Sequence, residues 1–294
     1  MELTIRNLSK TYANGVQALA GVSLAVPTGM FGLLGPNGAG KSTLMRTIAT
    51  LQEADEGSVT LDGLDVLKDK EAVRRRLGYL PQEFGVYPEV TAEGLLDHLA
   101  VLKGFSDRKA RKAEVDALLM QTNLYEARKK KLGEFSGGMK QRFGIAQALL
   151  GNPALIIVDE PTAGLDPQER NRFLNLLSEI GENVIVILST HIVDDVAELC
   201  RRMAIISRGE VLLAGTPEEA MRALTGKIWK KLIPKKDLAE VQRTHDVIST
   251  RLLGGQILLH VCSATTPDPS FQPVEPDLED VYFTTMRRRP GAAA

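Results

Sequence analysis

Cysteine is scarce in this sequence, which has only two in 294 residues, Cys200 and Cys262. Two thiols so far apart in the chain predict neither a disulfide framework nor a thiolate metal site. They favour reduced thiols in a cytoplasmic protein, because disulfides persist mainly in oxidising compartments.

Long apolar runs are also missing. A membrane-spanning helix needs about 20 consecutive apolar residues, and the longest uncharged stretch, Phe143–Val158, is interrupted by glycine, asparagine and proline. The first residues, Met1–Arg6, carry no apolar core of a signal peptide. If this chain serves a membrane, we expect it to act from the membrane surface.

An excess of charge of one sign is absent as well, because 36 Lys and Arg balance 37 Asp and Glu to a net charge of −1. This balance predicts no nucleic-acid partner, since such proteins usually carry a basic field. The basic run Arg128–Lys131 is interpreted as a solvated loop, with a lipid or nucleic-acid patch as the alternative. The composition, 44% hydrophobic and 25% charged, is typical of a globular protein.

Glycine is concentrated in one stretch on which the rest of the chain depends, Gly35–Thr43. An apolar run, Met30–Leu34, precedes it and a helical pattern, Leu44–Ala49, follows it, which is the context of a phosphate-binding loop. Such a loop points backbone N–H groups at phosphate oxygens, while Lys41 reaches the β- and γ-phosphates and the Ser42 hydroxyl reaches a magnesium ion. A glycine-rich turn that binds nothing is the alternative. The residues expected to hold a nucleoside triphosphate are Gly35, Asn37, Gly38, Ala39, Gly40, Lys41, Ser42 and Thr43.

A second apolar run, Ala154–Val158, ends in Asp159 and Glu160. Continuous apolar runs are typical of parallel strands that are buried on both faces. A carboxylate at the end of such a strand can hold magnesium, which is the role expected of Asp159. Glu160 has one more methylene of reach and could accept a proton from an attacking water. Taken alone, the pair could equally be a helix cap or a surface turn.

The periodicity of the chain predicts an α/β core in which strands alternate with helices. From Thr91 onward the spacing of Leu95, Leu96, Leu99 and Leu102 predicts a helical insert over about 88–150. Past residue 224 the pattern changes to strands at 228–233, 247–252 and 256–261, with short helices at 238–241 and 278–281. We therefore expect one domain over 1–224 and a small α+β domain over 225–294 that ends in a disordered tail.

Taken in order, the motifs resemble those of the nucleotide-binding subunit of ATP-binding cassette (ABC) transporters. Gly35–Thr43 resembles the family's Walker A loop, Gln82 its Q-loop and Phe135–Arg142 its signature motif. Further along the chain, Leu155–Glu160 resembles the Walker B strand with the catalytic glutamate, Ala163–Asp166 the D-loop and His191 the switch histidine. Tyr12 lies where the family keeps an aromatic residue that stacks on adenine. The resemblance implies a P-loop NTPase cassette with an antiparallel β subdomain and an inserted helical subdomain.

The same resemblance implies ATP and Mg²⁺ as cofactors and a second copy of the chain as a partner. Two copies sandwich two ATP molecules, and Ser136, Gly137 and Gly138 of each copy face the γ-phosphate held by the other. Asp166 then couples the two sites across the interface, and Gln82 and His191 sense whether the γ-phosphate is present. The implied catalytic residues are Glu160, His191 and Gln82, and the implied magnesium ligands are Ser42, Gln82 and Asp159.

A transport function requires a separate transmembrane permease subunit, because this chain has no span of its own. In the family, a groove beside Gln82 receives a short cytoplasmic helix of that subunit, which places the chain on the cytoplasmic face of the membrane. The aromatic residues Phe84 and Tyr87 fit such a docking site, with local packing as the alternative. The segments Tyr87–Glu93 and Pro276–Tyr282 resemble exporters of drugs, ions, lipids or polysaccharides.

Two departures from the family pattern fall in the signature motif, where Met139 stands for glutamine and Phe135 for leucine. We expect activity to survive, since the serine hydroxyl and the glycine amides make the phosphate contacts. The alternative function is a soluble cassette ATPase that acts on ribosomes or DNA, although such proteins usually carry two cassettes, a coiled coil or a zinc insert. A small-molecule kinase would leave Ser136–Gly138 without a role.

Overall fold

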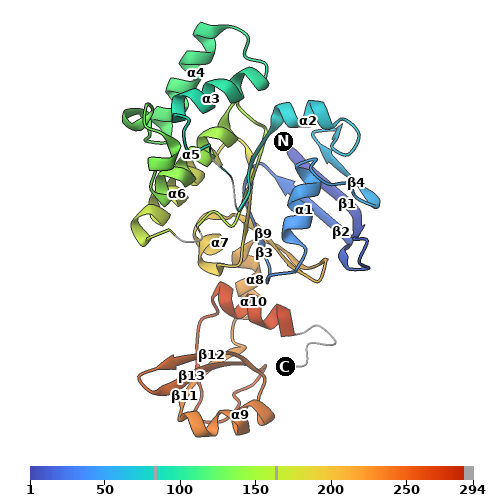
Figure 1. Cartoon of the computed structure of the whole chain (residues 1–294). Helices are drawn as coiled ribbons and strands as arrows, with labels where there is room; N and C mark the ends of the chain where they lie inside the picture. The colour runs from blue at the N-terminus through green and yellow to red at the C-terminus, as the bar shows by residue number, and fades with distance from the viewer. Residues whose placement is uncertain (83–84, 86, 163–164, 288–294) are drawn as a thin grey trace.

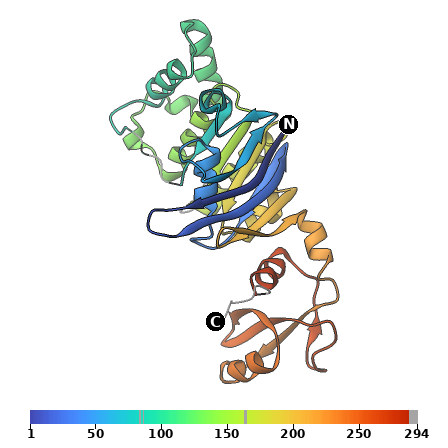
Figure 2. The ribbon, with the colours of Figure 1, turned by 90° about the vertical axis from the view of Figure 1, so that its right-hand side faces the viewer.

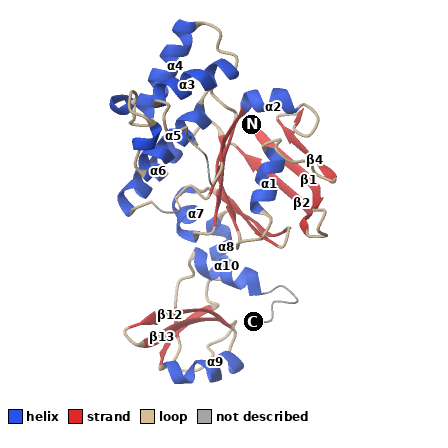
Figure 3. Ribbon diagram, in the orientation of Figure 1, coloured by secondary structure: helices blue, strands red, loops and turns tan. Residues whose placement is uncertain are grey.

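Two β-sheets face each other in the amino-terminal part of the chain, and helices cover the outer face of the larger one (Figures 1 and 3). The computed structural model describes residues 1–82, 85, 87–162 and 165–287. A smaller α+β unit follows on the carboxyl side and packs below this part of the chain (Figure 2). The α/β cassette fold predicted from the sequence is confirmed.

The smaller sheet is antiparallel, with the strand order β2-β1-β4-β5. Along β2, Val22, Leu24 and Val26 are buried while Ser23 and Ala25 are exposed, as expected of a strand with one face on a core. This sheet is the predicted antiparallel subdomain. Its strands are β1 (Glu2–Thr11), β2 (Gln17–Pro27), β4 (Glu56–Leu61) and β5 (Leu64–Asp65).

The larger sheet has the order β10-β9-β3-β8-β7-β6, and all its pairings except β10–β9 are parallel. Every residue of β7 and β8 is buried, which agrees with the continuous apolar runs in the sequence. The carboxyl ends of β3 and β7 lead directly to the phosphate loop and to Glu160. The strands are β3 (Gly29–Leu34), β6 (Leu77–Leu80), β7 (Leu155–Asp159), β8 (Ile185–Thr190), β9 (Arg202–Ser207) and β10 (Glu210–Gly215).

Alternate side chains of the larger sheet belong to two different cores. Ile157 packs in one core with Met45 of α1 and Ile5 of the smaller sheet, so α1 lies between the sheets. Ile156 packs on the opposite face with helices α3 to α7. The helices are α1 (Lys41–Ile48), α2 (Lys70–Arg76), α3 (Ala92–Leu102), α4 (Arg108–Gln121), α5 (Gly137–Leu149), α6 (Pro167–Ile180) and α7 (Val193–Leu199).

The predicted helical insert consists of α3, α4, two 3₁₀ turns (Tyr125–Ala127 and Leu132–Glu134) and α5, and α5 also packs against β6. Leu95 and Leu96 are buried, but Leu102, expected on the same apolar face, is 70% exposed. That prediction was wrong because Leu102 is the last residue of α3 and extends past the helices that cover Leu95.

The carboxyl-terminal unit contains the predicted strands at 228–233, 247–252 and 256–261 in an antiparallel sheet of order β12-β13-β11-β14. Helix α9 packs on one face of this sheet, and α10 packs on β12 and also on α7 and α8 of the cassette. The tail beyond residue 287, predicted to be disordered, lies outside the described residues. The elements are α8 (Pro217–Arg222), β11 (Ile228–Ile233), a 3₁₀ turn (Lys235–Asp237), α9 (Leu238–Thr244), β12 (Val247–Leu253), β13 (Gln256–Cys262), β14 (Gln272–Pro273) and α10 (Leu278–Arg287).

Two side-chain pairs join this third sheet to α10, the exposed pair Arg251–Glu279 and the more buried pair His260–Asp280. The Nδ1 atom of His260 on β13 lies 2.7 Å from an Oδ1 atom of Asp280, which is 1% exposed. The hydrogen bond to Asp280 raises the pKa of His260 above its ordinary value, and the charges of Asp280 and Asp277 act in the same direction. Burial and the nearby Lys230 oppose this shift without cancelling it.

The His260–Asp280 pair predicts a pH-dependent contribution to stability. Because the folded pKa of His260 is raised, the contribution is complete below the unfolded value of about 6.5 and is lost as the pH rises through the folded pKa. We expect His260→Asn to cost about 1–2 kcal/mol of unfolding free energy at pH 6 and less at pH 9. Denaturant titrations at both pH values measure the difference, with His98→Asn on the exposed side of α3 as the control. An equal cost at both pH values would contradict the prediction.

Candidate functional site

The loop between β3 and α1 has the backbone that a phosphate cradle requires. Gly40, the residue before α1, has a φ of 104°, and a Cβ atom there would collide with the carbonyl oxygen of Ala18. A hydrogen bond of 3.1 Å from Ala39 N to Pro36 O closes the loop, and Gly209 N donates to Ala39 O at 2.8 Å. The loop is therefore held in one shape, with the amino end of α1 opening onto it.

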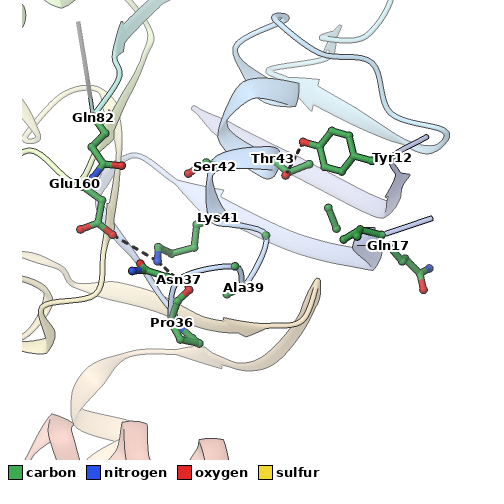
Figure 4. A pocket seen from close by; sticks show the side chains of 14 residues that line it. Tyr12, Gln17, Pro36, Asn37, Ala39, Lys41, Ser42, Thr43, Gln82 and Glu160 are labelled. Atoms are coloured by element: carbon green, nitrogen blue, oxygen red, sulfur yellow. Dashed lines mark hydrogen bonds and ion pairs between the residues drawn. The ribbon is translucent and has the colours of Figure 1, made fainter. Parts of the chain in front are cut away.

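Lys41 is the charged residue at the centre of this loop. It is 5% exposed, and its Nζ atom donates to Gly35 O at 2.6 Å and to Pro36 O at 3.3 Å. The same Nζ atom lies 3.5 Å from Oε1 of Glu160, as Figure 4 shows. A buried ammonium needs such partners, and this one is held where it can meet the phosphates of a nucleotide.

A cavity of about 320 Å³ opens above the loop and brings together most of the residues predicted to bind nucleotide (Figure 4). Tyr12 lies at its rim, 37% exposed, and its hydroxyl contacts Thr43 Oγ1 at 3.0 Å and Gln52 Oε1 at 2.9 Å. These contacts fix the ring where a base could stack on it. The predicted residues that line the cavity are Tyr12, Asn37, Gly38, Ala39, Gly40, Lys41, Ser42, Thr43, Gln82 and Glu160.

Four further residues line this cavity that the sequence did not indicate: Val16, Gln17, Ala18 and Pro36. Pro36 belongs to the loop itself and could have been named with it. The other three lie in the turn after β1 and at the start of β2, and the pairing of these strands carries them to the cavity. No local motif marks them, so only the sheet register could have identified them.

Asp159 ends β7 and is 4% exposed. Its Oδ1 atom is buried without a hydrogen-bond partner in the part of the chain that the structure describes. A buried, unpartnered carboxylate oxygen is a suitable ligand for Mg²⁺, which prefers oxygen ligands. Ser42 and Gln82, which line the cavity, carry a hydroxyl and an amide oxygen, so the types of donor present suit this ion.

Glu160 and His191 form a pair next to Lys41. The Oε2 atom of Glu160 lies 2.5 Å from Nδ1 of His191, and the Glu160 side chain is 8% exposed. Glu160 has a φ of 50°, a left-handed conformation that costs about 1–3 kcal/mol in a residue with a side chain. A backbone hydrogen bond of 2.8 Å to Ser189 O holds it there. The neighbouring strands β7 and β8 thus hold the Glu160 carboxylate next to Lys41 of the loop.

The remaining predicted residues lie away from this cavity. Ser136 caps α5, its Oγ atom accepting a bond of 3.2 Å from Met139 N, and both Ser136 and Gly137 are exposed. Asp166 caps α6 in the same way. Of the predicted D-loop, Ala163 and Gly164 lie outside the described residues. One chain therefore carries a glycine-rich loop beside the Glu160–His191 pair and, separately, a helix start at which Ser136 and Gly137 are exposed and Gly138 is buried.

The two departures in the signature motif are accommodated by packing. Phe135 is 4% exposed and meets Phe143 edge to face, with ring centroids 6.3 Å apart. Met139 is half-buried and packs against the core of helices α3 to α7. Neither side chain displaces the Ser136 hydroxyl or the amide groups at the start of α5.

A second hollow lies between α2, β6, α3 and α5 and has a volume of about 560 Å³. Leu99 and the exposed Leu102 supply its apolar wall, and Arg74 and Lys103 supply charge. Lys103 Nζ donates to Leu77 O at 3.0 Å and to Leu150 O at 2.8 Å, and burial lowers its pKa. We call this hollow the α2–α3 groove.

Of the aromatic residues predicted to dock a partner, Tyr87 is 68% exposed and Phe84 lies outside the described residues. None of the helices that the structure describes is long and apolar enough to cross a membrane.

Comparisons with known proteins identify the family of this chain. A family model described as ABC transporter matches residues 19–163. The chain is 37% identical over 226 residues to the linearmycin resistance ATP-binding protein LnrL of Bacillus subtilis. This alignment covers 76% of this chain and 72% of LnrL. The chain is 36% identical over 239 residues to the daunorubicin/doxorubicin resistance ATP-binding protein DrrA of Streptomyces peucetius, covering 80% and 72% respectively. The methionine import ATP-binding protein MetN of Bordetella pertussis is also 36% identical over 239 residues, covering 78% and 66%.

Solved structures give the same result. An ATP-binding subunit of an ABC transporter superposes with a TM-score of 0.67 at 31% identity, covering 76% of this chain and 93% of that one. The ATP-binding cassette MJ0796, in a dimeric structure of a post-hydrolysis state bound to ADP and Pi, gives a TM-score of 0.66 at 28% identity, covering 73% of this chain and 98% of that one.

Proposed function

The chain belongs to the ABC transporter family, as its ATP-binding, ATP-hydrolysing subunit, and from this premise we propose that two copies close around two ATP molecules and drive export. The observation that carries the proposal is the separation of two half-sites in one chain. Lys41 and Glu160 lie at one cavity, whereas Ser136 and Gly137 are exposed elsewhere. A symmetric dimer lets each half-site meet the other half-site of its partner copy.

Hydrolysis in this arrangement needs an activated water and a charge clamp. Glu160 accepts a proton from the water that attacks the γ-phosphorus, which cleaves ATP to ADP and phosphate. His191 holds the Glu160 carboxylate from its far side through the 2.5 Å contact. Lys41 exchanges its carbonyl contacts for phosphate oxygens and neutralises the charge that develops on them.

Ser42, Asp159 and Gln82 are the residues that would hold Mg²⁺ beside the phosphates. The ion supplies positive charge to the β- and γ-phosphate oxygens. The unpartnered Oδ1 atom of Asp159 supports this role, since a buried carboxylate without a cation or a donor is costly.

Export through a separate membrane subunit is the transport function that we propose, with the chain peripheral on the cytoplasmic face of the membrane. The relatives LnrL and DrrA are resistance proteins, which supports export, while MetN is an import protein and stands against it. We propose that the α2–α3 groove receives a helix of the membrane subunit, with Leu99 and Leu102 as its apolar contacts. Residues 225–294 then form an accessory domain, whose α10 packs on α7.

The docking proposal is tested by placing a charge in the groove. We expect Leu102→Asp to weaken the association with the membrane subunit that co-purifies in detergent about tenfold, because it buries a carboxylate in an apolar contact. ATP turnover of the isolated chain should not change. Met120→Asp, at a side chain on α4 that is 58% exposed, is the matched control. Equal retention of both variants on the membrane subunit would place the docking site elsewhere, and stimulation by RNA or DNA with no membrane protein attached would contradict transport.

A further inference from the structure

The first turn of α6 carries two consecutive charged residues that contact different helices. Glu169 contacts α5 and Arg170 contacts α7. The turn begins at Asp166, which caps α6 by accepting a bond of 2.9 Å from Glu169 N. Neither Glu169 nor Arg170 lines the nucleotide cavity, so the reaction described above gives them no role.

The Glu169 side chain lies against the half-site at the start of α5, which consists of Ser136–Gly138. Its carboxylate pairs with Arg142 of α5, and the Glu169 and Arg142 side chains are 20% and 13% exposed. A Cβ atom added to Gly138 would collide with this same carboxylate. The first turn of α5, which follows Ser136, therefore rests directly on Glu169.

The Arg170 side chain extends toward the segments that carry the other half-site, which contains Glu160 and His191. Its Nε atom donates to Oδ1 of Asp195 at 2.9 Å, and its NH2 group contacts the same oxygen. Asp195 is fully buried, and its second oxygen accepts a bond of 2.7 Å from Thr162 Oγ1. Thr162 follows Glu160 by two residues, and Asp195 lies on the helix that follows His191.

We propose that Glu169 and Arg170 form a relay that couples the two half-sites of one chain. A γ-phosphate that arrives at Ser136–Gly138 from the partner copy shifts α5, and Glu169 passes the shift to α6. Arg170 then passes it through Asp195 to the segments that carry Glu160 and His191. Arg142, Glu169 and Asp195 are largely buried. Breaking either ion pair would leave an unpaired charge inside the protein, which is costly, so each pair is held in one geometry. These are positioning residues, and the proposal rests on the dimer of the proposed function.

The test is a double-mutant cycle on the two ion pairs of the relay, Arg142–Glu169 and Arg170–Asp195. The two substitutions are Arg142→Gln and Arg170→Gln. Each single variant should lower kcat about three- to tenfold and leave the KM for ATP unchanged, since the cavity keeps its lining. The double variant should be no slower than the slower single variant, because the two ion pairs act in series. Arg172→Gln, which removes the more exposed partner of Glu169 on the same helix, should retain the kcat of the unmodified chain.

Additive losses in the double variant would overturn the relay, since Arg142 and Arg170 would then act independently. Unchanged kcat in either single variant would overturn it as well. Should Arg170→Gln fail to fold, as judged by thermal unfolding, Arg170→Lys serves in the cycle instead. Lysine keeps the positive charge but cannot place two nitrogens on Oδ1 of Asp195 as Arg170 does. We therefore expect a smaller loss of kcat than in Arg170→Gln.

A separate measurement distinguishes failure of the relay from failure of the dimer. ATP-dependent dimerisation is measured by light scattering in a Glu160→Gln chain with and without Arg170→Gln. No dimer in Glu160→Gln itself would remove the proposed function and the relay with it. A dimer there, combined with additive losses in the cycle, would remove the relay alone.

Discussion

Replacing Glu160 with glutamine should lower ATP turnover by at least about a hundredfold while ATP stays bound. Glutamine matches the size of the side chain and can keep a hydrogen bond to His191, but it cannot take a proton from water. Because hydrolysis no longer removes the γ-phosphate, we expect ATP-bound dimers to accumulate. Phosphate release and size-exclusion chromatography with light scattering measure the two effects.

The control for this substitution is Glu240→Gln, the same chemical change on the exposed face of α9. It should leave turnover and the monomer–dimer distribution unchanged. If Glu160→Gln released phosphate at the unmodified rate, Glu160 would not be the base, and the 2.5 Å contact with His191 would have only a structural role.

The half-site around Lys41 and Glu160 is predictable from sequence because its residues lie in two short segments that directly follow parallel strands of one sheet, with only β8 between those strands. Lys41 follows β3 and Glu160 follows β7, and the carboxyl ends of parallel strands meet at one edge of the sheet. The continuous apolar run before Asp159 indicated such a strand without any knowledge of the fold. The family resemblance added His191 and Gln82, whose local sequence alone says little.

The parts that the sequence did not predict depend on contacts between distant segments. Arg170 and Asp195 are ordinary charged residues of amphipathic helices until α6 and α7 pack side by side. The strands Leu64–Asp65 and Gln272–Pro273 are too short to show a period of two, so their pairing partners alone define them. Leu102 matched the helical period but lies at a helix end, where no neighbour covers it.

Two inactive variants of opposite kinds provide the second test with a large expected effect. Lys41→Met removes the charge that meets the phosphates and keeps an apolar stem of similar length, so ATP binding should fall by at least about a hundredfold. Gly137→Asp adds a negative charge at the start of α5, where a Cβ atom meets nothing within 4 Å and an acidic residue favours the helix. It should still bind ATP at its own cavity but repel the γ-phosphate of a partner copy. Gly137→Ala is its control and should remain active.

Mixing these two inactive variants should restore turnover, because a mixed dimer has one site with both defects and one site with neither. Random pairing makes about half of the dimers mixed, and one of their two sites is intact, so about a quarter of the unmodified rate is the upper limit. Coupling between the half-sites through Glu169 and Arg170 would reduce the recovery below this limit. No recovery, with ATP-dependent mixed dimers shown by a tag on one variant, would mean that one chain completes its own site and that Ser136–Gly138 does not meet the partner's ATP.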